Sequence, residues 1–316
     1  MSSAGTNSLH KRQPLFVFTD PGIDDAVALA MVSLRSDLDL FGACGVDGNV
    51  PADLASTNTL KIFNLVPSKN VPVFRGPSIR TSSFEYPVWV HGRNGLGNVR
   101  LPRPMQAILP GKALNNFLKR KKSFKVLSLG PLTALSTLLE ESPEIAKKVS
   151  ECVIMGGAIE RGNVTPYAEF NIYADPEAAD KVFRADLPKV LIPLDITEKV
   201  CLFPRDLALI SGAKNKSVRQ IVKMLKFYFD FQRKKDGFNG GYMHDPTALV
   251  ALIHPALFRF KRALVEVDTS KGKFRGRTVA RFSRIRRKSN TMVACAVNVE
   301  KVRSVIIGDL LNQKLR

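Results

Sequence analysis

Three aspartates within six positions, Asp20, Asp24 and Asp25, constrain this chain more than any other feature. They lie where an apolar run, Leu15–Phe18, gives way across a Pro-Gly break to a helical apolar pattern that continues to Leu34. Like charges this close repel, so a fold that keeps all three ionised needs a cation or a set of donors beside them. The first turn of a helix favours carboxylates, which supports a metal site here. The alternative is that the two later aspartates only cap the helix.

The rest of the chain continues this alternation of strands and helices. Strands are predicted at Leu15–Phe18, Leu38–Val46, Val71–Phe74, Phe124–Leu129, Cys152–Met155 and Val190–Leu194. Helices are predicted at Asp24–Leu34, Asp53–Leu65, Lys112–Lys121, Ala134–Glu140 and Asn215–Lys234, with another opening at Asp175-Pro176. This order predicts an α/β fold whose open, mostly parallel sheet carries helices on both faces.

Polar or glycine-rich positions follow several of the predicted strands. Asp20, Asn49, Leu129 and Gly156-Gly157 each fall at or just after the end of one. The carboxyl ends of parallel strands share one edge of the sheet, and ligands bind at that edge. We therefore expect these positions to meet along one rim, although Asn49 alone would also fit an ordinary turn.

The domain organisation looks simple. The 316 residues are 45% hydrophobic, which is enough for a large core, and no repeat or linker divides them. We expect one domain over residues 15–316 after a disordered leader at 1–14. That leader lacks acidic residues, which also fits an organelle presequence. No apolar run is long enough to cross a membrane, and the four scattered cysteines fit a reducing, cytoplasmic protein.

The net charge of +20 is concentrated near the C-terminus. The basic portion, residues 259–288, holds twelve Lys or Arg against only Glu266 and Asp268, and its alternating apolar positions predict hairpin strands. Such a surface attracts phosphates, so weak nonspecific nucleic-acid binding is expected there. A basic nucleic-acid-binding protein is therefore one alternative function, although no base-reading motif accompanies the charge.

Nine short motifs recur in a consistent order from about Leu15 to Leu257. They are Asp20-Pro21-Gly22-Ile23-Asp24-Asp25, Gly48-Asn49-Val50, His91-Gly92, Gly130-Pro131-Leu132-Thr133, Met155-Gly156-Gly157, Gly162-Asn163, Ala168-Glu169-Phe170-Asn171, Asp175-Pro176-Glu177-Ala178 and His244-Asp245-Pro246. Together they resemble the inosine-uridine-preferring nucleoside hydrolases, most closely the broad-specificity ribonucleoside hydrolases. The resemblance fades in the basic portion.

The resemblance implies the nucleoside hydrolase fold, a tightly bound Ca²⁺, a homodimer or homotetramer, and hydrolysis of the N-glycosidic bond of ribonucleosides to ribose and a purine or pyrimidine base. Carried over by position, the metal ligands are Asp20, Asp25, Asp245 and the carbonyl of Leu129. The substrate-binding residues are Asp24, Asn49, Met155, Asn163, Glu169, Phe170, Asn171 and Asp245. Oxygen ligands of this kind suit a hard cation, and carboxylates with amides suit vicinal hydroxyls.

The expected mechanism follows from the bond that breaks. Cleavage of a ribosyl C–N bond builds positive charge on the sugar, which surrounding carboxylates stabilise. Asp25 is expected to act as the general base on a calcium-bound water. His244, and after it His91, is expected to protonate the leaving base, because histidine titrates in a useful range. Each histidine alone would also fit a helix cap or an ordinary loop.

Two positions depart from the family pattern. Phe18 stands where the family usually has an aspartate, and Gln232 stands where it often has a tyrosine. Tyr228 or Tyr242 is a substitute for that tyrosine if the segment around it folds over the substrate. These departures leave a second alternative open, a nucleoside-binding protein with impaired catalysis.

Overall fold

The computed structural model describes residues 12–65, 70–79, 85–213, 216–285 and 289–311. Within these ranges a nine-stranded sheet has the order β10-β9-β11-β6-β5-β4-β1-β2-β3. Its strands are β1 (Gln13–Thr19), β2 (Leu38–Gly45), β3 (Val73–Arg75), β4 (Phe124–Ser128), β5 (Val149–Met155), β6 (Lys189–Ile192), β9 (Phe258–Val267), β10 (Thr278–Phe282) and β11 (Thr291–Val297). Neighbours from β3 to β11 are parallel, whereas β9 is antiparallel to both β11 and β10. The predicted mostly parallel sheet is confirmed.

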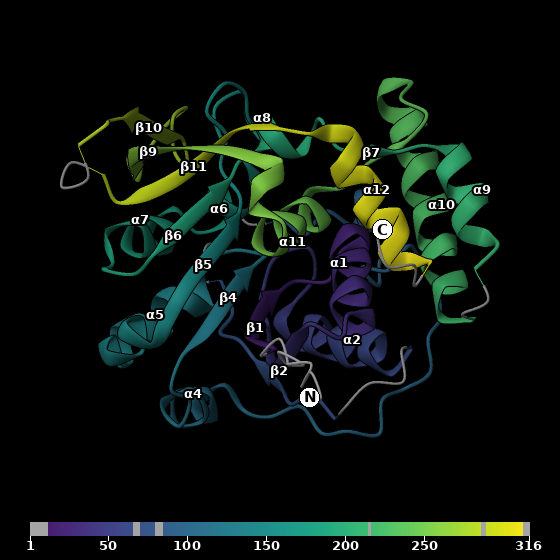
Figure 1. Ribbon diagram of the computed structural model, residues 1–316, viewed down its shortest axis with the longest axis horizontal. Coiled ribbons are helices and arrows are strands. Elements are labelled where there is room, and N and C mark those ends of the chain that lie inside the picture. Colours follow the sequence, from purple (N-terminus) through teal and green to yellow (C-terminus); the bar gives the residue numbers. More distant parts are fainter. Residues whose placement is uncertain (1–11, 66–69, 80–84, 214–215, 286–288, 312–316) are drawn as a thin grey trace, which may run out of the picture.

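Helices cover both faces of the sheet (Figure 1). One face carries α1 (Ile23–Leu34), α2 (Ala52–Leu65), α10 (Lys216–Asp236), α11 (His244–Ile253) and α12 (Val299–Leu310). The other carries α4 (Leu114–Lys119), α5 (Thr133–Glu141) and α7 (Pro176–Arg184). Each layer buries its own apolar cluster against the strands, which explains why neither face of the sheet is polar. The predicted α/β class is therefore confirmed.

Shorter elements connect these layers. They are α3 (Val88–His91), α6 (Phe170–Ala174), α8 (Leu194–Thr197), α9 (Pro204–Ser211), the ribbon of β7 (Cys201–Leu202) and β8 (Gly241–Tyr242), and 3₁₀ turns at Gly111–Ala113, Pro143–Lys148 and Pro255–Leu257. The helix expected over Lys112–Lys121 is therefore only α4, preceded by a 3₁₀ turn. In the part of the chain that the structure describes, no helix is long and apolar enough to cross a membrane.

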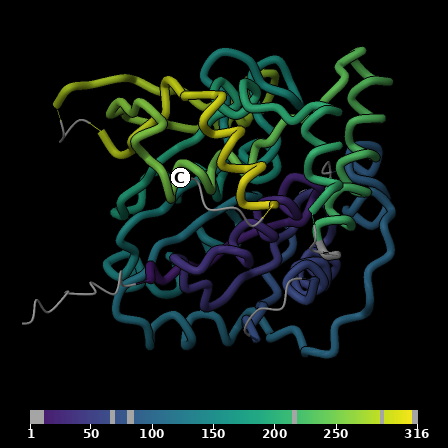
Figure 2. Tube along the Cα trace, turned by 45° about the vertical axis from the view of Figure 1, so that its right-hand side comes forward, coloured from purple at the N-terminus to yellow at the C-terminus, as the bar shows by residue number. Residues whose placement is uncertain are grey.

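The last helix of the described chain packs against the first. α12 packs against α1, and Figure 2 shows the C-terminal helix returning toward the first one. β1 begins at Gln13, two residues before the expected start of the domain, and the rest of the expected leader, up to residue 11, lies outside the described residues. The basic portion forms the antiparallel pair β9 and β10 as predicted, and its residues 286–288 also lie outside the described ranges.

Alternate residues of β1 belong to different layers. Leu15 and Val17 join the cluster that contains α1, whereas Phe16 and Phe18 join the opposite cluster. The rings of Phe16 and Phe18 meet edge to face with centroids 5.1 Å apart. Phe18 is buried in this aromatic cluster, so the position where the family usually has an aspartate is filled here by apolar packing.

Candidate functional site

A cavity of about 840 Å³ lies at the carboxyl ends of the central strands. Asn49 after β2 and Leu129 after β4 contribute to its lining, as predicted from their places after strands, and Met155 at the end of β5 lines it as the family resemblance implies. Asp20 and the Gly156-Gly157 pair, predicted at the same rim, are not among its lining residues. The structure also brings Asp24, His91, Asn163, Glu169, Phe170, Asn171, His244 and Asp245 to the lining. Its size suits a nucleoside-sized ligand.

Three buried carboxylates meet at this cavity. Oxygens of Asp24, Asp25 and Asp245 lie within 4.8 Å of one another, and the three residues are 6%, 1% and 3% exposed. Asp24 and Asp25 lie in the first turn of α1 and Asp245 in the first turn of α11, and these two helices pack together. Burial and the Asp25 charge raise the pKa of Asp24 to about 7 and that of Asp245 well above its usual range. A positive charge bound among these carboxylates would therefore stabilise their ionised forms.

Hydrogen bonds fix the orientation of Asp25. Its Oδ1 accepts from Thr19 Oγ1 at 2.5 Å and from the Asp20 backbone N–H at 3.3 Å. Its Oδ2 accepts from the Gly22 N–H at 3.0 Å and from Asn49 Nδ2 at 3.4 Å. Four donors from β1, the Pro-Gly break and the loop after β2 thus hold one carboxylate in place.

Asp20 provides the test of whether a cation fits. Its Oδ2 accepts the Asn49 N–H at 2.7 Å, but its fully buried Oδ1 has no hydrogen-bond partner in the described structure. Burial and the nearby Asp25 charge raise its pKa well above the usual range. A buried carboxylate oxygen without a partner is costly, and a hard cation that accepts oxygen ligands would satisfy it. The donor set therefore fits a hard metal ion.

Two glycines leave room around Asp20. A Cβ on Gly48 would lie 2.1 Å from its Oδ2, and a Cβ on Gly130 would lie 2.3 Å from its Oδ1. The expected ligand carbonyl of Leu129 accepts a hydrogen bond from Asn171 Nδ2 at 2.7 Å, which leaves it one lone pair. The group of mutually close carboxylates contains Asp24 together with the predicted ligands Asp25 and Asp245, and it does not contain Asp20.

Glu169 and Asn163 organise the opposite wall through backbone hydrogen bonds. Glu169 caps α6, where its carboxylate accepts the N–H groups of Asn171 at 2.9 Å and Ile172 at 3.2 Å, and it also accepts the Gly157 N–H at 2.9 Å. Burial raises the pKa of Glu169. Asn163 Oδ1 accepts the backbone N–H of Phe170 at 3.0 Å. Both residues therefore shape the wall while lining the cavity.

The two histidines are held by different partners. His91 Nδ1 accepts the Ile23 N–H at 3.1 Å, and its ring stacks on Tyr228 with centroids 6.1 Å apart. His244 Nδ1 lies 2.8 Å from Thr197 Oγ1, and its ring stacks on Tyr242 at 5.7 Å. Each ring therefore has one nitrogen and one face already engaged.

Burial keeps both histidines neutral. It lowers the pKa of His244 to about 4, and burial with the charge of His244 lowers that of His91 to about 3. The expectation that they titrate near neutral pH is therefore wrong. At neutral pH each can donate an N–H hydrogen bond, but neither is an imidazolium acid.

Several residues at the mouth of the cavity gave no signal in the sequence. Trp89 is 57% exposed on α3, and Glu85, Arg161, Glu198 and Lys235 join it in the lining. No spacing or motif marks them because they come from separate loops and helix ends.

The departure at Gln232 also faces the cavity. Gln232 is buried, lies one helical turn after Tyr228 on α10, and is hydrogen-bonded to it. Burial raises the pKa of Tyr228 well above its usual range, so its hydroxyl stays protonated. Tyr228 and Tyr242, the two proposed substitutes for the family tyrosine, both line the cavity.

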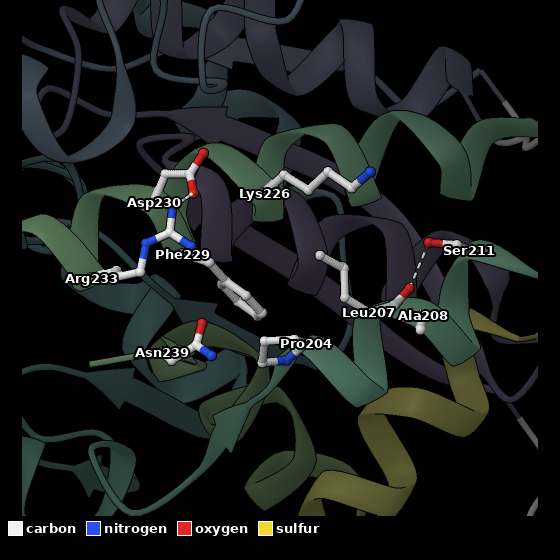
Figure 3. A pocket seen from close by; sticks show the side chains of 9 residues that line it. All are labelled: Pro204, Leu207, Ala208, Ser211, Lys226, Phe229, Asp230, Arg233 and Asn239. Carbon is white, nitrogen blue, oxygen red and sulfur yellow. Dashed lines mark hydrogen bonds and ion pairs between the residues drawn. The ribbon is translucent and has the colours of Figure 1, made fainter. Parts of the chain in front are cut away.

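A second hollow lies on the outer side of α10, where it meets α9 (Figure 3). It measures about 400 Å³ and is lined by Leu207, Phe229 and the ion pair of Arg233 with Asp230 at 2.7 Å, among others. Asp230 is already paired, and no further carboxylate lines the hollow among the described residues. This hollow therefore lacks the chemistry of the larger cavity.

Comparison with known proteins agrees with this geometry. The family described as inosine-uridine preferring nucleoside hydrolase matches residues 15–304. Uridine nucleosidase 1 of Arabidopsis thaliana is 38% identical over 269 residues, which cover 83% of this chain and 80% of that protein. Among solved structures, the purine-preferring ribonucleoside hydrolase from Gardnerella vaginalis has a TM-score of 0.88 at 28% identity and covers 95% of this chain and 98% of its own. A plant nucleoside hydrolase has a TM-score of 0.85 at 30% identity, with 95% and 99% covered.

The chain belongs to the inosine-uridine preferring nucleoside hydrolase family. It is an enzyme, and the reaction of its class is hydrolysis of the N-glycosidic bond of ribonucleosides.

Proposed function

We propose that this enzyme uses Ca²⁺ to hydrolyse ribonucleosides to ribose and a purine or pyrimidine base. The observation that carries the proposal is the cluster of Asp24, Asp25 and Asp245 within 4.8 Å, of which Asp24 and Asp245 line a nucleoside-sized cavity. The unpartnered buried Oδ1 of Asp20 adds to it. The proposed metal ligands are Asp20, Asp25, Asp245 and the carbonyl of Leu129. Bound calcium supplies positive charge and orientation to water and ribose hydroxyls.

The side chains of the protein carry the proposed bond cleavage. Asp25, fixed by four donors, takes a proton from the attacking water, whose oxygen bonds to the anomeric carbon. The C–N electron pair leaves with the base. The surrounding carboxylates stabilise the positive charge that develops on the sugar. Asp24 accepts hydrogen bonds from the ribose hydroxyls, and Asn49 can both donate and accept them. Asn163, Glu169 and Asn171 bind the substrate from the opposite wall, together with Met155 and Phe170.

The cavity and the relatives support a broad range of bases. Its volume of about 840 Å³ accommodates a purine nucleoside as well as a pyrimidine nucleoside. One relative is named a uridine nucleosidase and one structural neighbour a purine-preferring hydrolase. We propose that uridine and inosine are both substrates.

Ribose release tests this function. Inosine, uridine, adenosine and cytidine are incubated with the enzyme in the presence of Ca²⁺ or of excess EGTA. Turnover with Ca²⁺ and its loss in EGTA are expected, and Asp25→Ala should abolish it. Asp230→Ala, which alters an exposed aspartate outside the cavity, should keep it. Binding of nucleosides without any ribose release would instead indicate the catalytically impaired alternative.

The remaining assignments are also proposals. We propose a cytoplasmic homodimer or homotetramer, a state that the family resemblance implies, and light scattering coupled to size-exclusion chromatography tests its size. Weak nucleic-acid binding rests on the exposed Arg259, Lys261 and Arg262 of β9. Fluorescence anisotropy with single-stranded RNA at low and high salt tests it, and absence of binding at low salt would dismiss it.

A further inference from the structure

Thr197 makes a contact that the proposed reaction does not yet use. It is fully buried at the end of α8, which follows β6, and its Oγ1 lies 2.8 Å from Nδ1 of His244. This distance is that of a good hydrogen bond. The partners are 47 residues apart in the sequence, so only the fold brings them together.

The direction of this hydrogen bond depends on the tautomer of His244, and other buried helical hydroxyls show that such a proton finds an acceptor. Thr59 and Thr247, which are equally buried, donate to the carbonyl four residues earlier at 2.8 and 2.6 Å. Among the described residues, His244 is the partner that the structure gives the Thr197 hydroxyl. A fully buried hydroxyl proton without an acceptor is costly, and donation to Nδ1 supplies the acceptor. A neutral imidazole that accepts at Nδ1 carries its own proton on Nε2.

The ring of His244 is also restrained on its face. Tyr242 stacks on it with centroids 5.7 Å apart, and both residues line the cavity. With Nδ1 turned to Thr197, the remaining ring nitrogen is Nε2.

We propose that Thr197 is a positioning residue that holds His244 in the Nε2–H tautomer, so that His244 donates a hydrogen bond to the departing nucleobase. The inference rests on the proposed function. In the step itself, the C–N electron pair moves onto the base nitrogen, Asp25 keeps the proton taken from water, and His244 gives up none. The base gains its proton afterwards from solvent. The histidine thus stabilises negative charge as it forms on the leaving group.

His91 offers a natural comparison. Its Nδ1 accepts the main-chain N–H of Ile23, which fixes the same tautomer through a donor that side-chain substitution leaves in place. Thr197 supplies the equivalent donor to His244 from a side chain. The role of that donor can therefore be tested by mutation.

The test compares Thr197→Val, which keeps the shape and removes the hydroxyl, with Thr197→Ser, which keeps the hydroxyl. Thr197→Val should lower kcat for uridine and inosine about 10-fold with little change in KM, because one orienting hydrogen bond is lost. Hydrolysis of 4-nitrophenyl β-D-ribofuranoside, whose leaving group is stable as an anion, should be spared. Thr197→Ser should restore most of the nucleoside activity.

The tautomer itself can be observed. The chain has four histidines, and ¹⁵N-imidazole labelling with His244→Gln as the assignment variant isolates one ring. A neutral ring protonated at Nε2 is expected in the wild type, and a mixture of tautomers in Thr197→Val.

Several outcomes would overturn the inference: equal kcat in Thr197→Val and the wild type, an equal loss on the aryl riboside, failure of serine to restore activity, or a wild-type ring protonated at Nδ1. Failure of the proposed function looks different, because the wild type itself would then release no ribose.

Discussion

Replacing Asp24 by asparagine is expected to stabilise the calcium-free protein at alkaline pH while it abolishes nucleoside hydrolysis. Asp24 is buried within 4.8 Å of the carboxylates of Asp25 and Asp245. Asparagine keeps its size and one acceptor oxygen and removes its charge. The substitution therefore separates the cost of the carboxylate cluster from the packing around it.

The magnitude follows from the pKa and from the geometry. A carboxyl whose pKa rises from 3.8 to about 7 on folding lowers stability by about 4 kcal/mol above pH 7. Coulomb repulsion gives a similar value, since two charges 4.8 Å apart repel by about 3.5 kcal/mol at an effective dielectric constant of 20. The penalty is absent below pH 3.8, where the carboxyl is protonated in both states. It grows between pH 3.8 and 7, because there the unfolded chain ionises first.

Urea unfolding in EGTA at pH 5 and pH 8 measures this difference. The free energy of unfolding of the wild type should fall between the two pH values, and saturating Ca²⁺ should restore it at pH 8. Asp24→Asn should be about 3 kcal/mol more stable than the wild type at pH 8 in EGTA. Asp53→Asn, in the first turn of α2, removes an exposed ion pair with Arg75 and should change stability by less than about 1 kcal/mol. A wild type whose stability does not fall with pH in EGTA would refute the reasoning.

Two further substitutions probe the surroundings of the site. Gly130→Ala places a Cβ 2.3 Å from Asp20 Oδ1 and should weaken Ca²⁺ binding at least about 10-fold by isothermal titration calorimetry, whereas Gly212→Ala, whose nearest contact is at 3.3 Å, should leave it unchanged. Arg303 and Asp206 form a buried pair at 2.6 Å outside the cavity, so Asp206→Ala should lower the free energy of unfolding by about 3 kcal/mol in urea and leave kcat intact. Unchanged stability in Asp206→Ala would show that the pair is not the buried charge contact described.

The rim of the site could be predicted because local signals mark it. Asp20, Asn49 and Leu129 each follow an apolar run that forms a parallel strand, and parallel strands end at a common edge. The acidic first turn of α1 was visible as an aspartate pair after Pro-Gly. Apolar residues recur every two residues in a strand and every three to four in a helix, and this pattern can be read from the sequence alone. These elements and their order could therefore be predicted.

The partners within the site could not be predicted in the same way. The contact of His91 with the Ile23 N–H spans 68 residues, and no local pattern encodes it. The pKa values of His91 and His244 depend on burial by segments that arrive from elsewhere in the chain, so the expectation of ordinary histidine titration was wrong. Trp89 belongs to a four-residue helix inside a Gly- and Pro-rich segment, where helical periodicity is too short to detect.

The docking of α11 on α1 has a consequence for when activity can appear during synthesis. More than two hundred residues separate Asp25 from Asp245, and α12, which also packs on α1, follows still later. A ribosome-bound chain that ends before α11 carries Asp20, Asp24 and Asp25 but lacks Asp245, which completes the cluster. Catalytic competence is therefore expected only after α11 has been made, when six of the nine strands of the described sheet have been synthesised.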